Sequence, residues 1–111
     1  MRPTRFYSKQ QEKAVAKSTG GKVVANSGAT RFNKGDVVTE HLLIECKTKT
    51  SPTNSFAIKK EWLEKNKEEA LAMGKQYPVL AFNYGPGEPN YYVIDERTFR
   101  QFKSFLEMEE N

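Results

Sequence analysis

The sequence is poor in two residue types that often carry chemistry, with one cysteine, Cys46, and one histidine, His41. A single cysteine cannot form a disulfide within the chain, which fits a reducing compartment. A cysteine nucleophile would also need a partner base, and His41 is expected in a turn where it is poorly placed to act as one. We therefore expect Cys46 to be a buried apolar residue rather than a reactive thiol.

Long apolar runs are also missing. No stretch of about 18 apolar residues occurs, so no transmembrane segment is expected. The first residues, MRPTRFYSKQQEK, lack the apolar stretch of a secretory signal. We expect a cytoplasmic protein, located in the host cytoplasm if a phage encodes it. A length of 111 residues suffices for one modest core, so we predict a single domain over 1–111 that ends in an acidic tail, 107–111.

The charge is unevenly distributed along the chain. Residues 1–35 carry eight Lys or Arg and a single acid, Glu12, whereas the remaining residues carry ten bases and thirteen acids. A basic excess in one part of a domain suits a polyanion such as nucleic acid. The alternative is that these bases only keep the surface soluble, and charge alone does not decide between the two.

Apolar periodicity and turn residues predict eight elements in the order α-β-β-β-α-β-β-α. They are a helix over 9–18 capped by Ser8, strands over 22–25, 36–39 and 42–47, a helix over 58–73, strands over 77–84 and 91–94, and a final helix capped by Asp95. A hairpin joins the second and third strands, and the long crossover helix implies a mixed sheet. The fold class is therefore α/β (α+β mixed), a central five-stranded mixed sheet flanked by helices.

Two short segments stand out for their chemistry, GDVV at 35–38 and IECK at 44–47. Glu45 and Lys47 are two residues apart on one predicted strand, so their side chains project to the same face. A tight hairpin would bring Asp36 beside Glu45. Two adjacent carboxylates repel unless a cation neutralises them, and hard oxygen ligands suit Mg²⁺ or Mn²⁺. An E-x-K pair on a strand is usually a solvated face, but the apolar neighbours here favour a site.

Other groups have plainer interpretations. The Lys and Glu residues of the 58–73 helix form balanced pairs that are typical of a solvated face. Trp62 and the set Phe99, Phe102 and Leu106 are expected to pack in the core.

The residues Glu12, Gly35-Asp36 and Ile44-Glu45-Cys46-Lys47-Thr48 together resemble the PD-(D/E)xK nuclease superfamily. Within it, the chain is most similar to archaeal-type Holliday-junction resolvases and related phage endonucleases. The likeness covers roughly residues 8 to 95 and implies a restriction-endonuclease-like core. Gly35 stands where the superfamily usually has proline, and the acidic tail argues against DNA contact by that end.

The resemblance implies a role for each matching residue. Asp36 and Glu45 would bind Mg²⁺, for which Mn²⁺ would substitute, and the backbone carbonyl of Cys46 would be a further ligand. Lys47 would be the catalytic lysine, and Glu12 an additional acidic residue and candidate ligand. The residues expected to contact DNA are Arg5, Lys9, Lys13, Ser27, Arg31, Lys34 and Thr48.

The function expected from this resemblance is a Mg²⁺-dependent DNA endonuclease that hydrolyses phosphodiester bonds in four-way junctions and leaves a 5′-phosphate. A homodimer would present two sites to two strands. Three alternatives stay open: a nicking or restriction-like nuclease on ordinary duplex, a catalytically silent DNA-binding module, and an RNA-binding basic domain. The last lacks an aromatic RNA-recognition motif.

Overall fold

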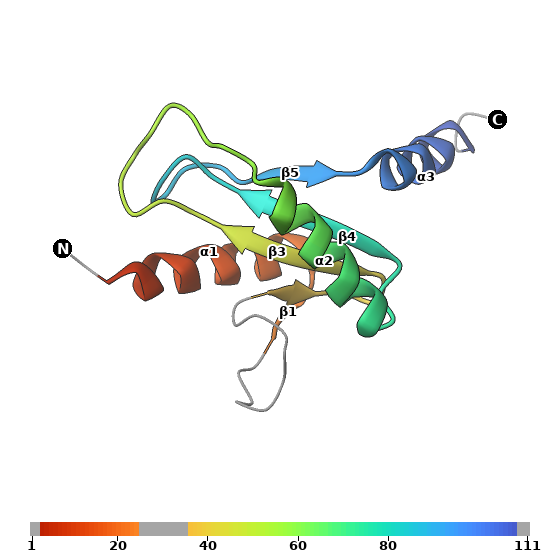
Figure 1. Ribbon diagram of the computed structural model, residues 1–111, viewed down its shortest axis with the longest axis horizontal. Helices are drawn as coiled ribbons and strands as arrows, with labels where there is room; N and C mark the ends of the chain where they lie inside the picture. The colour runs from red at the N-terminus through yellow and green to blue at the C-terminus, as the bar shows by residue number, and fades with distance from the viewer. Residues whose placement is uncertain (1–2, 25–35, 109–111) are drawn as a thin grey trace.

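A computed structural model describes residues 3–24 and 36–108 of the chain. Within these residues the fold is an α/β mixed fold of three helices and one five-stranded mixed sheet, in the predicted order (Figure 1). The elements are α1 (Thr4–Thr19), β1 (Lys22–Val23), β2 (Val37–Val38), β3 (Leu42–Lys47), α2 (Lys60–Ala72), β4 (Tyr77–Phe82), β5 (Tyr91–Ile94) and α3 (Glu96–Met108). None of the helices in this part of the chain is long and apolar enough to cross a membrane.

The strands lie side by side in chain order, β1-β2-β3-β4-β5. β3 and β4 run parallel, and the other neighbouring pairs are antiparallel. Parallel neighbours need a crossover connection, and α2 supplies it between β3 and β4. β2 and β3 form the predicted hairpin, in which the backbone N–H of Thr39 donates to the carbonyl of Leu42 at 3.0 Å.

The central strand β3 is covered on both faces, by α1 behind the sheet and by α2 in front of it (Figure 1). Ile44 points towards α1 and belongs to a fully buried cluster that joins the helix to the sheet. The members of this cluster are Val15, Val37, Ile44, Val79 and Ala81. Side chains alternate along a strand, so Leu43, Glu45 and Lys47 point to the α2 side. The predicted division of β3 into these two faces is confirmed.

Helix α1 begins earlier than predicted. Pro3 precedes its first residue with extended backbone, and the helix starts at Thr4 rather than at Lys9. Ser8 is not the N-cap, because it lies inside the helix and its hydroxyl donates to the carbonyl of Thr4 at 3.3 Å. Proline fits the start of a helix because its missing N–H would have no helical partner there.

Helix α3 departs most from expectation. Asp95 caps it as predicted, accepting a 2.8 Å hydrogen bond from the backbone N–H of Thr98. The prediction that Phe99, Phe102 and Leu106 pack in the core is wrong, because these side chains are 58%, 40% and 68% exposed. The helix continues outward from the end of β5 and extends away from the sheet (Figure 1).

Candidate active site

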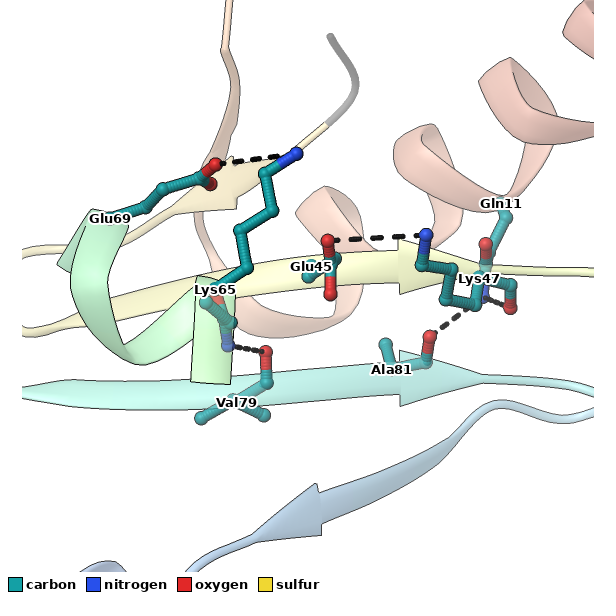
Figure 2. Close-up of polar contacts among 8 residues, drawn as sticks. Gln11, Glu45, Lys47, Lys65, Glu69, Val79 and Ala81 are labelled. Atoms are coloured by element: carbon teal, nitrogen blue, oxygen red, sulfur yellow. Dashed lines mark hydrogen bonds and ion pairs between the residues drawn. The ribbon is translucent and has the colours of Figure 1, made fainter. Parts of the chain in front are cut away.

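Strand β3 places a carboxylate and an ammonium on the face that α2 covers. Glu45 is buried and Lys47 is partly exposed. The Lys47 Nζ atom lies 4.0 Å from Glu45 Oε1 (Figure 2). The same atom lies 4.5 Å from the centre of the Trp62 ring. The ammonium is therefore held between a carboxylate and an aromatic face, which limits the directions in which it can point.

Asp36 comes to the same place from the neighbouring strand. Val37 pairs with Ile44 in the antiparallel β2–β3 register, so Asp36, one residue earlier, falls opposite Glu45. The carbonyl of Asp36 accepts a 2.7 Å hydrogen bond from the backbone N–H of Val24. Asp36 is thereby held in the sheet at the edge of β2, and the predicted meeting of its carboxylate with Glu45 is present.

These side chains line a pocket of about 580 Å³ between the sheet and α2. Its walls are Asp36, Glu45, Cys46 and Lys47 from the sheet and Glu61, Trp62 and Lys65 from the helix. The side chain of Cys46 packs against the α1-side cluster, and the residue also lines the pocket. Burial raises the pKa of the Cys46 thiol, consistent with the prediction that it is a buried apolar residue.

Electrostatics single out Asp36. Burial, then the charge of Glu45 and then that of Glu69, raise its pKa to about 8, and Lys47 opposes the rise. Among the described residues no donor reaches its buried Oδ2 atom. A buried carboxyl group that faces another carboxylate and has an oxygen without a donor is costly to ionise, so this position favours a bound cation.

The residues present fit a divalent metal ion of the magnesium type. Mg²⁺ is commonly held by one or two carboxylates and keeps several waters, and Asp36 and Glu45 supply two such groups. In the part of the chain that the structure describes, no three His, Cys, Asp or Glu side chains come together as a metal cluster. Asp36 and Glu45 would therefore be the side-chain ligands, with main-chain, water or phosphate oxygens completing the coordination.

Glu12 lies on α1 and is not among the pocket walls. It is buried, and its Oε2 atom lies 3.4 Å from Arg5 Nη1. Burial raises the pKa of Glu12, against the lowering effects of Arg5 and Lys9. Its charge reaches Asp36 and raises that pKa further, but less than the charges of Glu45 and Glu69 do. Glu12 is thus near the site without joining the two carboxylates in one cluster.

The other residues expected to contact DNA fall into three groups. Lys9 and Lys13 are exposed on α1. Thr48 is engaged within the protein, because its hydroxyl donates to Asn83 Oδ1 at 2.5 Å. Three further positions lie outside the described residues: Ser27, Arg31 and Lys34.

Three residues of α2 belong to the site although the sequence predicted a solvated face for them: Glu61 and Lys65, which line the pocket, and Glu69. Lys65 lines the pocket, and its Nζ atom lies 3.9 Å from Glu69 Oε1 (Figure 2). The Glu69 side chain is only 11% exposed, and its charge acts on Asp36. Because their alternating charges match those of an exposed helix, the pattern gave no sign that one turn of α2 faces β3.

Gln11 is a further residue that the sequence did not single out. Its buried amide Nε2 donates to the main-chain carbonyl of Lys47 at 2.8 Å and to that of Ala81 at 3.3 Å (Figure 2). It also donates to Asn90 Oδ1 at 3.1 Å. One side chain from α1 thus ties together the carboxyl ends of β3 and β4, where Lys47 leaves the strand.

No family model matches the chain, and no curated protein or solved structure is significantly similar to it.

Proposed function

We propose that the chain is a metal-dependent DNA endonuclease of the PD-(D/E)xK kind. The observation that carries the proposal is the convergence of Asp36, Glu45 and Lys47 in one pocket, two carboxylates from adjacent strands and an ammonium two residues along. A solvated strand face would leave these carboxylates in water, whereas both are buried. Buried like charges are retained where a cation or a reaction needs them.

Each residue has a role in this proposal. Asp36 and Glu45 would hold Mg²⁺, and Mn²⁺ would substitute. When bound, the ion supplies Lewis-acid stabilisation of the phosphate and activates water for attack. Lys47 donates to a phosphate oxygen or to the attacking water from its position against Trp62. Trp62 restricts the ammonium to the pocket side of β3.

The exposed charge of α1, on the other face of the sheet from the pocket, supports nucleic acid as the substrate. Arg5, Lys9, Lys13 and Lys17 are exposed and follow each other at four-residue intervals, so they form one basic stripe along α1. A basic stripe is the electrostatic footprint expected for a phosphate backbone. A branched substrate, with a four-way junction as the first choice, is the finer part of the proposal and comes from the family resemblance. A cytoplasmic location is also part of the proposal.

One experiment separates the rival functions. A labelled four-way junction and a linear duplex of matched sequence are incubated with the protein in Mg²⁺ and in Ca²⁺, beside Lys47→Ala. We expect cleavage of the junction in Mg²⁺, binding without cleavage in Ca²⁺, and loss of cleavage but not of binding in Lys47→Ala. Equal cutting of both DNAs would show that the protein does not select junctions and would favour a nuclease of ordinary duplex. Binding in Mg²⁺ with no cutting would leave a silent DNA-binding module.

A further inference from the structure

Among the described residues, helix α3 carries more of the exposed large apolar side chains than any other element. They recur at helical spacing and include three phenylalanines. The set, which we name the α3 apolar face, consists of Phe99, Phe102, Phe105, Leu106 and Met108. Phe105 and Leu106 are 58% and 68% exposed. An amphipathic helix gains most of its stability by burying such a face, so one that points into water lacks its usual partner.

Within residues 3–24 and 36–108, the side-chain contacts between α3 and the body of the chain come from its first two turns. The Arg97 guanidinium donates to the carbonyl of Gln76 and lies 5.1 Å from the Tyr77 ring centre. The Phe102 ring centre is 6.3 Å from that of Tyr77. Asp95 alone separates the end of β5 from the start of α3. After this short connection the helix extends away from the sheet (Figure 1).

The exposed area is large enough to matter for association. At about 200 Å² for each large side chain, exposures of this size leave roughly 500 Å² of apolar surface on one copy. Two copies that cover each other would bury roughly 1,000 Å², the lower size of specific interfaces. A face that is its own complement suits a two-fold axis, in which the same patch is used on both subunits.

The charges of α3 favour a protein partner over a lipid surface. Helices that lie on anionic membranes carry mainly Lys and Arg on the polar face. Here the polar residues have both signs, with Glu96 and Glu107 beside Arg97, Arg100 and Lys103. The Lys103 Nζ atom lies 2.6 Å from Glu107 Oε1, so part of the positive charge is already neutralised. Two such helices would also repel each other only weakly.

We infer that the α3 apolar face is the interface of a homodimer, with α3 of one copy packed against α3 of the other. This assignment rests on the exposed side chains of α3 and not on nuclease activity. It places the interface on a helix beyond β5, whereas the pocket opens between β3 and α2. Each copy would therefore keep its own complete site in the dimer.

Sedimentation velocity of the full chain across a wide range of protein concentrations tests the inference. We expect the wild type to sediment at twice the monomer mass of 12.7 kDa. Phe105→Glu would bury a charge in the interface and should weaken the dimer by a factor of about 100 or more. The matched control Ser104→Glu places the same charge on the polar side and should leave the dimer intact. Far-UV circular dichroism shows that each variant is folded.

Leu106→Gln changes the same face more mildly and should weaken the dimer in the same direction. A monomeric wild type at every concentration would overturn the inference, as would a Phe105→Glu variant that remains fully dimeric. A monomer that co-sediments with phosphatidylserine and phosphatidylcholine vesicles through this face would assign the α3 apolar face to lipid instead.

Discussion

Asp36, the residue before β2, falls opposite Glu45 of β3, close enough that the charge of Glu45 raises the pKa of Asp36. Burial is the larger cause of that rise. The relationship links the hairpin, the most local feature of the fold, to the chemistry of the pocket. Because the raised pKa makes the free energy of unfolding depend on pH, the destabilisation caused by placing the two carboxylates together can be measured without any substrate.

The first prediction concerns how stability depends on pH. The pKa of Asp36 is about 8 in the folded protein, against 3.8 for an ordinary aspartate. Between these values the folded chain binds a proton that the unfolded chain does not, so its free energy of unfolding should fall as pH rises from 4 to 8. Asp36→Asn removes this loss and should be more stable than wild type at pH 8, by about 2 kcal/mol.

Urea denaturation of the metal-free protein at several pH values measures this. Asp95→Asn is the control, because the pKa of Asp95 is lowered, mainly by its hydrogen bonds to Thr98, against the effect of burial. Asp95→Asn should give no gain at pH 8. A wild-type protein whose stability is flat from pH 4 to 8 would contradict the assigned environment of Asp36.

The second prediction concerns proton release on metal binding. A metal ion needs the ionised carboxylate, and Asp36 is largely protonated at neutral pH because its pKa is about 8. Binding of Mg²⁺ or Mn²⁺ should therefore release close to one proton at pH 7 and should weaken as the pH falls. Calorimetric titrations in buffers of different ionisation enthalpy count the protons. Metal binding with no proton release would place the ion elsewhere.

The third prediction tests the contribution of α2 to the site. The charge of Glu69 raises the pKa of Asp36, so Glu69→Gln should lower that pKa. The loss of stability with rising pH should then end at a lower pH than in wild type. Glu68→Gln is a matched control, since Glu68 is exposed and adjacent but is not among the groups that act on Asp36. Carbon-13 NMR titration of the Asp36 carboxyl group gives the pKa directly. Equal shifts of the Asp36 pKa in both variants would contradict a specific effect of Glu69.

The fourth prediction concerns Gln11. Gln11→Ala removes the side-chain amide that binds the carbonyls of Lys47 and Ala81 and leaves both acceptors less satisfied. Stability should fall by about 1–3 kcal/mol. The exposed neighbour Gln10→Ala, with no such bonds among the described residues, should change little. If Gln11→Ala unfolds at the wild-type urea concentration, this side chain does not tie the strands together.

Local patterns predicted the fold well where period and turn chemistry agreed. The strand Leu42–Lys47 and the strand Tyr91–Ile94 are confirmed residue by residue, as is the hairpin before Leu42. The alternation along β3 was enough to put Glu45 and Lys47 on one face. The start of α1 was missed because Ser8 matches an N-cap. Its hydroxyl instead bonds within the helix to the carbonyl of Thr4, and the helix begins after Pro3.

The parts of the site that depend on tertiary packing were not predicted. Lys65 and Glu69 have the spacing of a solvated ion pair, and only the placement of α2 against β3 brings them to Asp36. Gln11 binds strand ends that lie 36 and 70 residues away in the chain. The phenylalanines of α3 have the period of a core helix, but their burial requires a facing apolar surface that the described residues do not provide.

The central claim is that Asp36, Glu45 and Lys47 form a metal-dependent phosphodiesterase site. Single-turnover cleavage of a labelled four-way junction in Mg²⁺, compared between wild type and Asp36→Asn, tests it most directly. We predict that Asp36→Asn cuts slower by a factor of about 1,000 or more while binding the junction in Ca²⁺ as tightly as wild type. Cleavage by Asp36→Asn at the wild-type rate would contradict the account.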